Sequence, residues 1–405
     1  MKVLVLTHNY PRFHGDFSGT FIEALSEAVA AQGHDITVLT PHDPRFARLP
    51  GDHHVNLVTY RYAWPSRLHV LGYMRSTRGD RALRLSSVLL APFLFLFGTL
   101  AALRIAWRQH PDVIHAHWVL PNGFIGALAA RLLGIPLVVS LPGSDVFVSG
   151  LNPLFLAMAR FAFHQAAFIT TNSDDLCQAA VDLGAQPDKM RLIIYGVDPQ
   201  AIAPDLSHRA ELRQRLGIGE RTPVVLAVGR LVAKKGFDVL VRSAQDLNPS
   251  AHIVIVGDGD QRAELEQSAL SLEVSEKLHF VGNVPRQELT DYYNMADVFA
   301  MPSVRLPVDG LNVVVVEAMS CGLAVVASNV GGNPLVVRDG DNGLLVPEGN
   351  VPQLAAAINR VLNDLALRLR MGGRSRERVL DEFSWNRLAA EYVDMFSSIR
   401  RGSRG

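Results

Sequence analysis

The chain has 405 residues, 48% of them hydrophobic, and its 39 basic side chains balance 39 acidic ones. At roughly 100–200 residues per domain, this length predicts two or three domains, each with its own core, and excludes a disordered or fibrous protein. A net charge of zero excludes binding through bulk positive charge, so we expect no nucleic-acid partner.

Apolar segments alternate with helical ones along the first half of the chain. Residues 2–7 and 36–39 are apolar, and a Gly/Pro-bearing loop (11–19) and a helix (21–31) lie between them. Continuously apolar strands are buried on both faces, as in a parallel sheet covered by helices. We therefore predict a doubly wound first domain. The alternation continues with strands and helices expected over 112–115, 123–133, 137–140, from about 153, and over 168–170.

A second series of buried strands follows a polar stretch punctuated by Pro and Gly. That stretch, from about 196 to 222, is typical of a linker. The predicted fold class is therefore α/β, with two tandem Rossmann-like domains over 1–200 and 201–383. A C-terminal helix over 384–405 is expected to return to the N-terminal domain. The strands of the second domain are expected over 224–228, 253–256, 279–281, 298–300 and 324–327.

The segment 85–104 is apolar enough to be a transmembrane candidate. A single crossing would place strands of one sheet on opposite sides of the bilayer, so the segment must stay on one side. Because residues 61–108 carry eight Arg and one acidic residue, we expect contact with an anionic membrane surface rather than a buried core helix with a basic rim. On a helix, small side chains form one stripe (Ser87, Ala91, Gly98, Ala102) and bulky ones the opposite face (Leu85, Leu89, Phe93, Leu96, Leu100).

Two carboxylates lie eight residues apart, Asp309 at the entrance and Glu317 in the second turn of a short predicted helix, in a segment that ends at Gly322. The N-terminus of a helix offers unpaired N–H groups and a positive dipole end to a diphosphate, and a carboxylate two turns on can accept both hydroxyls of a ribose. Such a pair also arises by chance, so the nucleotide interpretation depends on a second motif.

That second motif is cationic. Arg230 directly follows the strand at 224–228, and Lys235 comes five residues later, at the carboxyl edge where sheets of this class bind ligands. A leaving diphosphate gains negative charge as its bond breaks, and fixed cations stabilise that transition state. The two motifs together favour a diphosphate site over a solvated cationic loop.

These motifs resemble the retaining nucleotide-sugar glycosyltransferases of the GT-B architecture, in glycosyltransferase family 4 (glycosyl transferases group 1). The resemblance covers nearly the whole chain. It is carried by Gly19, His115 to Trp118, Gly143 to Asp145, Ile194 to Asp198, Val228 to Arg230, Lys235-Gly236, Val256 to Gly259, Pro302-Ser303, Asp309 to Gly322, Val330 to Gly332 and Asp339 to Val346.

The resemblance implies a donor site in which Arg230 and Lys235 hold the diphosphate and Glu317 binds the ribose. Backbone N–H groups of residues 311–313 would face the distal phosphate or sugar, and Gly19 would let the first loop approach the donor. The residues implied to bind the donor are Gly19, Gly229, Arg230, Lys235, Leu311, Asn312, Val313 and Glu317. Those implied to act in catalysis are Arg230, Lys235, Asp309 and Glu317.

Two positions depart from the family pattern. The family usually has Glu where this chain has Asp309, and the shorter side chain withdraws the carboxylate, which predicts an altered sugar preference. The family often has His-Gly-x-Asp where this chain has Pro142, so a His that reaches the transferred sugar is absent there. His117 and Asp145 are then the candidates to contact the sugar or the acceptor; the alternative for each is a strand-end residue that is hydrogen-bonded within the fold.

No cofactor is expected. Asp258-Gly-Asp260 and Asp339-Gly-Asp341 mimic a metal-binding D-x-D, but Asp-Gly first signals a turn, so we expect no metal. Val256 to Gly259 lacks the third Gly of the dinucleotide fingerprint, which argues against a redox cofactor. The only two cysteines exclude a disulfide framework and a Cys-based zinc site, and they fit a reducing cytoplasm.

The sequence thus predicts a retaining, metal-independent hexosyltransferase. It would move a sugar from a nucleotide diphospho-sugar to a membrane-associated acceptor, lipid-linked or polysaccharide, and lie in the cytoplasm, peripheral on the inner face of the cell membrane. Two alternatives stay open. A sugar-nucleotide epimerase of the same architecture would need no separate acceptor. A non-catalytic, nucleotide-sugar-binding scaffold of a polysaccharide assembly complex is motivated by Pro142 and Asp309, but it would not need Arg230, Lys235 and Glu317 together.

Overall fold

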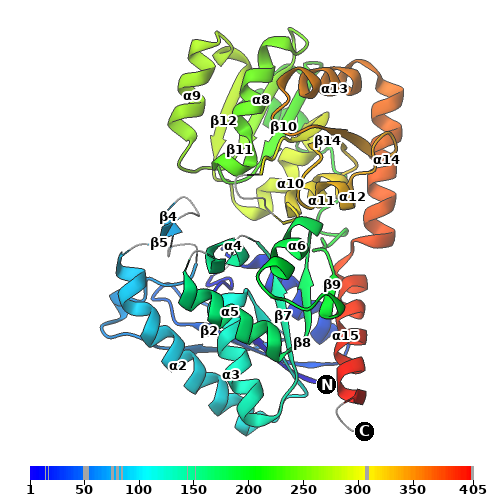
Figure 1. The fold of residues 1–405 in the computed structure, drawn as a ribbon. Helices are drawn as coiled ribbons and strands as arrows, with labels where there is room; N and C mark the ends of the chain where they lie inside the picture. Colours follow the sequence, from blue (N-terminus) through cyan, green and yellow to red (C-terminus); the bar gives the residue numbers. More distant parts are fainter. Residues whose placement is uncertain are drawn as a thin grey trace. The chain divides into compact units, whose positions relative to one another are not determined.

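The computed structural model describes residues 1–13, 15–16, 18–48, 54–73, 77–78, 82–83, 85–143, 145–150, 152–305 and 310–402. The chain divides into two compact units, unit 1 (Met1–Tyr195 with Trp385–Gly405) and unit 2 (Gly196–Ser384). Each unit is a parallel sheet with helices around it, so the predicted class of two Rossmann-like α/β units is confirmed (Figure 1).

Unit 1 contains a seven-stranded parallel sheet in the order β3-β2-β1-β6-β7-β8-β9. Its strands are β1 (Lys2–Leu6), β2 (Asp35–Pro41), β3 (Asn56–Tyr60), β6 (Val113–His117), β7 (Leu137–Leu141), β8 (Ala166–Thr171) and β9 (Met190–Leu192). A separate antiparallel pair consists of β4 (Thr77–Arg78) and β5 (Ala82–Leu83). The helices and helical turns are α1 (Thr20–Ala31), η1 (Ser66–Leu68), α2 (Leu85–Gln109), η2 (Val119–Gly123), α3 (Phe124–Leu133), α4 (Asp145–Gly150), α5 (Pro153–Gln165), α6 (Asp174–Asp182), η3 (Pro187–Lys189) and α15 (Trp385–Gly402).

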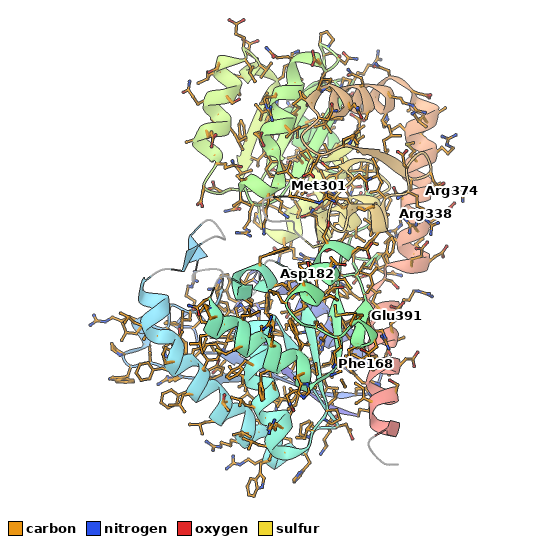
Figure 2. All side chains as sticks on the ribbon, viewed as in Figure 1. Phe168, Asp182, Met301, Arg338, Arg374 and Glu391 are labelled. Carbon is orange, nitrogen blue, oxygen red and sulfur yellow. The ribbon has the colours of Figure 1, made fainter. Side chains whose placement is uncertain are left out.

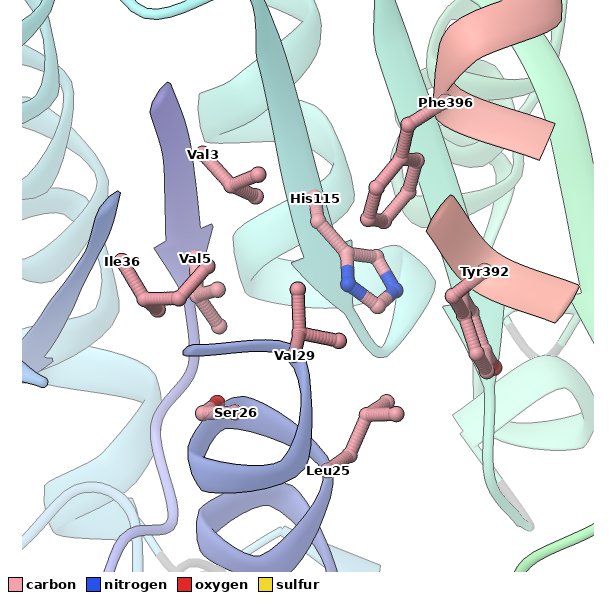
Figure 3. Close-up of a pocket in the computed structure, with 9 residues that line it drawn as sticks. All are labelled: Val3, Val5, Leu25, Ser26, Val29, Ile36, His115, Tyr392 and Phe396. Atoms are coloured by element: carbon pink, nitrogen blue, oxygen red, sulfur yellow. The ribbon is translucent and has the colours of Figure 1, made fainter. Parts of the chain in front are cut away.

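Different helices cover the two faces of this sheet, because successive side chains of a strand point to opposite faces. Leu4 and Leu6 of β1 belong to the core that α2, α3 and α5 close, and these three helices lie side by side (Figure 1). Val3 and Val5 face the other way, into a small cavity lined by residues of α1 and α15 (Figure 3).

The C-terminal helix α15 is part of the core of unit 1. Figure 3 shows Tyr392 and Phe396 of this helix beside His115 of β6. The Tyr392 hydroxyl lies 3.4 Å from Ser140 Oγ and 3.3 Å from Thr170 Oγ1, and Ser140 Oγ lies 2.7 Å from His115 Nε2. This buried network joins three central strands to the last helix. The predicted return of the C-terminal helix to the N-terminal domain is therefore confirmed.

Unit 2 contains a six-stranded parallel sheet in the order β12-β11-β10-β13-β14-β15. Its strands are β10 (Val224–Val228), β11 (His252–Val256), β12 (Leu278–Gly282), β13 (Val298–Met301), β14 (Ala324–Ser328) and β15 (Gly343–Val346). The helices and helical turns are α7 (Arg209–Arg215), η4 (Ala233–Lys235), α8 (Phe237–Ser243), η5 (Ala244–Asp246), α9 (Arg262–Ser271), η6 (Ser275–Lys277), α10 (Arg286–Met295), α11 (Val313–Ser320), α12 (Asn333–Val336), α13 (Val351–Asn363) and α14 (Leu365–Glu382).

The stretch 196–222, expected to be a linker, instead packs within unit 2. Its helix α7 carries Arg213, which is buried and donates hydrogen bonds to the Met295 carbonyl at 2.9 and 2.8 Å. The same guanidinium pairs with Asp297 at 2.9 Å. These polar contacts hold the segment together with the buried side chains of Val197, Leu212 and Ile218. Its polar, Pro- and Gly-bearing composition nevertheless resembles that of a linker.

Candidate functional site

The topology of unit 2 marks one edge of its sheet for ligand binding. From the neighbouring strands β10 and β13 the chain proceeds outward in opposite directions, to β11 and β12 on one side and to β14 and β15 on the other. Open parallel sheets bind ligands outside the carboxyl ends of the strands at such a reversal of strand order. The predicted residues Gly229, Arg230 and Lys235 all lie in the segment that follows β10. They are therefore at this switch point.

A chain of side-chain contacts joins the segments after β10 and β13. Lys235 Nζ donates a hydrogen bond to Asn312 Oδ1, and Asn312 Nδ2 donates to Ser303 Oγ at 3.1 Å. Ser303 follows β13, which ends at Met301, labelled in Figure 2. Asn312 is buried and directly precedes α11. The structure thus brings the predicted cation Lys235 to the amino end of the predicted phosphate-binding helix.

The amino end of α11 keeps its capacity to bind an anion. Leu311, Asn312 and Val313 lie there, as predicted for residues that meet the distal phosphate or sugar. The Asn312 side chain makes no capping hydrogen bond to the helix, because it bonds Lys235 and Ser303 instead. The helix dipole and the first N–H groups therefore remain directed at this end. Asp309 lies outside the described residues.

Glu317 is buried on α11 and already has two protein partners. Its Oε2 accepts a hydrogen bond from the Tyr293 hydroxyl at 2.7 Å, and its Oε1 lies 3.2 Å from Arg286 Nη2. Burial, and then the charge of Glu317, hold the pKa of Tyr293 well above its usual value, so this hydroxyl stays a donor. Neither partner was predicted from the sequence. Their i, i+7 spacing on α10 indicates a shared helix face, but no sequence signal pairs that face with α11.

Gly236 allows the segments after β10 and β13 to touch through their backbones. Its φ is 66°, and a Cβ at this position would lie 1.9 Å from the Pro302 carbonyl oxygen. Beside it, the Val304 N–H donates to the Lys234 carbonyl at 2.9 Å. Any other residue at position 236 would push the two segments apart and displace Lys235.

Unit 1 has its own switch point, between β1 and β6. Gly19 lies in the segment after β1, with a φ of 71°, and a Cβ there would lie 2.3 Å from the Asn9 carbonyl oxygen. This close approach within the loop gives Gly19 a structural role in addition to the predicted approach to the donor. Asp145 begins α4, after β7, and its side chain lies outside the described residues.

His117 ends β6 and is buried, yet neither of its ring nitrogens has a hydrogen-bond partner among the residues that the structure describes. Burial, and then the neighbouring His115 and His8, hold the pKa of His117 well below its usual value. The ring is therefore a neutral imidazole with one unused donor and one unused acceptor. Within the described part of the chain, the side chain makes none of the hydrogen bonds that the alternative interpretation, a strand-end residue hydrogen-bonded within the fold, would need.

Aromatic rings surround His117. The Phe21 ring of α1 lies 6.5 Å from the His117 ring and 4.5 Å from that of Tyr195. Trp118 adopts a φ of 68°, a backbone strain of the kind that clusters at functional sites, and its ring lies 4.4 Å from His8. Neutral hydrogen-bonding groups and aromatic rings suit a polyhydroxylated ligand better than a charged one.

Comparison with known proteins gives matches to both units. The family profile described as "Glycosyl transferases group 1" matches residues 208–378, and that described as "Glycosyl transferase 4-like domain" matches residues 18–196. The chain is 33% identical over 287 residues to a GDP-mannose-dependent alpha-(1-6)-phosphatidylinositol monomannoside mannosyltransferase of Mycolicibacterium smegmatis, which covers 69% of this chain and 75% of that relative. It is 32% identical over 319 residues to D-inositol 3-phosphate glycosyltransferase 1 of Catenulispora acidiphila, covering 73% and 74% of the two chains.

Solved structures show the same fold. Anabaena Alr3699/HepE in complex with UDP superposes with a TM-score of 0.76 at 23% identity, covering 98% of this chain and 100% of that one. Sucrose-phosphate synthase from Thermosynechococcus elongatus gives a TM-score of 0.79 at 22% identity, with 99% of both chains covered. The two-unit architecture named in the sequence analysis is thus confirmed.

Proposed function

Because the chain belongs to the glycosyl transferases group 1 family and is a glycosyltransferase, we propose that it transfers a sugar from a nucleotide diphospho-sugar to an acceptor with retention at the anomeric carbon. Unit 2 would bind the donor and unit 1 the acceptor. The acceptor we propose is membrane-associated, either a lipid-linked saccharide or a polysaccharide. The enzyme would work in the cytoplasm, at the inner face of the cell membrane.

The contact of Lys235 with Asn312 at the amino end of α11 carries the donor assignment. It puts a fixed cation and a helix N-terminus at one switch point, which is where a diphosphate is stabilised. Glu317 supports the nucleotide on the same helix. A carboxylate offers about four lone-pair sites, and Tyr293 and Arg286 occupy only some of them. Capacity to accept ribose hydroxyls therefore remains.

In the proposed reaction an acceptor hydroxyl oxygen forms the new bond to the anomeric carbon. The bond from that carbon to the diphosphate breaks, the electron pair stays on the diphosphate, and the hydroxyl proton passes to the departing phosphate oxygen. Lys235, with Arg230 in the same segment, would stabilise the charge that grows on the leaving group. His117 would bind hydroxyls of the sugar or acceptor through its two ring nitrogens, to which no described residue is hydrogen-bonded.

A screen of nucleotide sugars tests this proposal. Thermal-shift measurements with UDP-, GDP-, ADP- and dTDP-sugars are expected to give stabilisation by one base, since a ligand at 100 times its dissociation constant adds about 2.7 kcal/mol. Product analysis with that donor alone and with a lipid-linked acceptor then separates transfer from epimerisation. If none of these donors stabilised the protein, the result would contradict the proposal.

The outward face of α2 supports the membrane-associated acceptor. Six bulky side chains on this face are 41–68% exposed, while Ala102 is buried and a Cβ at Gly98 would lie 2.8 Å from Ile125 Cδ1. Ala91 is half-buried, and the side chains of Ser87, Arg75, Arg78, Arg81 and Arg84 lie outside the described part of the chain. The helix is also long and apolar enough, over Leu89–Gln109, to cross a membrane by length and composition. The exposed side chains are Leu89, Phe93, Leu96, Phe97, Leu100 and Trp107.

Changing both Phe93 and Leu96 to Ser is expected to weaken binding to anionic vesicles by roughly 100-fold, because each buried apolar side chain contributes about 1.5–3 kcal/mol before losses. Nucleotide affinity should stay at the parental value. Vesicle co-sedimentation measures the first and calorimetry the second. Raised salt should also weaken binding, since the exposed Arg104 and Arg108 flank this face.

The matched control for the vesicle experiment changes Leu365 and Leu369 to Ser. These leucines are 58% and 67% exposed on α14 of unit 2, so the control removes a similar apolar area from another surface. It should bind vesicles as the parent does. If the parent protein did not bind anionic vesicles at low salt, the result would contradict the membrane assignment.

A chelator is expected to leave transfer activity intact. In each Asp-Gly-Asp segment the first carboxylate already accepts a backbone hydrogen bond. Asp258 Oδ1 accepts from the Gly259 N–H at 2.8 Å, and Asp339 Oδ1 accepts from the Leu345 N–H of β15 at 2.9 Å. An activity assay with and without EDTA checks this. Loss of activity that Mg²⁺ or Mn²⁺ restores would show that a metal takes part.

A further inference from the structure

A second histidine lies at the switch point of unit 1, beside His117. Strands β1 and β6 are neighbours in the sheet and pair in register, with Leu6 opposite Ala116. His8 lies two residues beyond the end of β1, and His117 ends β6. Both histidines therefore lie at the carboxyl ends of adjacent strands, where sheets of this class bind ligands.

Asn122 connects these two histidines through its side-chain amide. Its Nδ2 donates a hydrogen bond to the His117 backbone carbonyl at 2.8 Å and lies 2.9 Å from His8 Nδ1. An amide nitrogen carries two hydrogens and does not accept, so Nδ2 is the donor in both contacts. The reversed amide would put Asn122 Oδ1 against the carbonyl oxygen of His117, two acceptors without a hydrogen between them. His8 Nδ1 must therefore accept, and it carries no hydrogen.

The other ring nitrogen of His8, Nε2, is then the one that carries the hydrogen. Burial lowers the pKa of His8 to about 4, so at pH 7 the ring is neutral and has a single N–H. No described residue is hydrogen-bonded to Nε2, and this nitrogen is not one of the buried atoms that lack a partner. Because His8 is only half-buried, its Nε2–H remains available to a ligand.

From these contacts we infer that Asn122 is a positioning residue that holds His8 in the Nε2–H tautomer, so that His8 donates a hydrogen bond to a polyhydroxylated ligand at this switch point. Since the lone pair of Nδ1 is taken up by Asn122, His8 can donate to a ligand oxygen but cannot accept its proton. His117 offers one donor and one acceptor beside it. This set matches hydroxyl groups, each of which both donates and accepts. Only the identification of the ligand as the transferred sugar or the acceptor rests on the proposed function.

Long-range ¹H–¹⁵N NMR spectra of the full ¹⁵N-labelled chain test the tautomer without any ligand, because protonated and unprotonated ring nitrogens give well separated ¹⁵N signals. His8, assigned with His8→Gln, is expected to show a protonated Nε2 and an unprotonated Nδ1 at pH 7. Asn122→Asp puts an acceptor opposite Nδ1. It should therefore move the hydrogen to Nδ1 or give a doubly protonated ring.

Asn172→Asp is the matched control for Asn122→Asp. Asn172 is buried directly after β8, at the same edge of the sheet, and its Nδ2 donates to the Pro142 carbonyl at 3.4 Å rather than to a ring. The control should leave the parental His8 signals in place. If the parent carried its hydrogen on Nδ1, or if the two variants gave the same His8 spectrum, the inference would be overturned. The measurement on the parent decides the tautomer even if Asn122→Asp does not fold.

Titration with methyl α-glucoside and with myo-inositol, two neutral polyhydroxylated rings, tests the ligand. One or both are expected to shift the Nε2 signal of His8 together with the His117 signals, while the signals of His252 and His279 in unit 2 should not move. His8→Leu should weaken binding of such a probe by roughly two- to twelvefold, since a neutral hydrogen bond contributes about 0.5–1.5 kcal/mol. His8→Gln keeps an N–H donor and should recover part of this loss.

His164→Leu is the matched control for His8→Leu. It removes an exposed imidazole at the end of α5, and this end precedes β8 and so lies at the amino ends of the strands. It should change the probe affinity less than twofold. A His8 signal that neither probe moves, or equal affinities of the two Leu variants, would overturn the assignment of His8 to a ligand. The titrations need neither a nucleotide sugar nor transfer, so their failure would leave the proposed group transfer standing, and the reverse also holds.

Discussion

Replacing Lys235 with Ala is expected to lower the turnover number by roughly 10²–10³-fold, with a much smaller rise in the donor KM. Negative charge on the diphosphate grows toward the transition state, and Lys235 is held by Asn312 at the amino end of α11. The lost interaction is therefore stronger in the transition state than in the bound donor. Arg230→Ala should act in the same direction. Steady-state kinetics with varied donor measure both constants.

Lys277→Ala is the matched control for Lys235. It removes the same charge from unit 2, but at η6, which precedes β12 and so lies at the amino ends of the strands. Its kinetics should stay close to those of the parent. If Lys235→Ala and Arg230→Ala changed only the donor KM, their role would be uniform binding and not stabilisation of the transition state.

Glu317→Ala is expected to weaken binding of the bare nucleotide by roughly 10–100-fold, since hydrogen bonds to a charged group contribute about 1.5–3 kcal/mol. It should also lower the free energy of unfolding by about 1–3 kcal/mol, because the buried Tyr293 hydroxyl loses its acceptor. Calorimetry with the nucleotide selected by the screen measures the first effect, and chemical denaturation measures the second.

Tyr293→Phe separates the two effects of Glu317. It removes the same hydrogen bond but leaves the carboxylate and its pair with Arg286 in place. We expect lower stability with nearly parental nucleotide affinity. If Glu317→Ala bound the nucleotide as tightly as the parent, Glu317 would belong to the core of unit 2 and not to the donor site.

The central strands and the orientation of α2 could be predicted because each depends on a local pattern. A strand buried on both faces, such as β1 or β10, must be apolar at almost every position. The small stripe of α2 follows from helical spacing, and Gly98 packs as that spacing predicts, against Ile125 and Tyr60. In both elements burial alone decides which side chains are tolerated, so the sequence shows the structure directly.

The side-chain partners within the site could not be predicted in the same way. Lys235 and Asn312 are 77 residues apart, and the resemblance implied only a backbone role for Asn312. The pairing of Glu317 with Tyr293 depends on how α10 and α11 pack. The same reason explains the error at α7, where Arg213 bonds carbonyls of another segment. Such contacts depend on tertiary packing, and tertiary packing leaves no periodic pattern in the sequence that could predict them.

The position of α15 also has a consequence for the order in which the protein is made. Strand β1 is synthesised before unit 2, but Tyr392 and Phe396, which close the cavity beside Val3 and Val5, are synthesised after it. Unit 2 lies wholly between these two segments of the chain. One face of the sheet of unit 1 therefore stays incompletely covered until the whole of unit 2 has been synthesised and α15 has followed it.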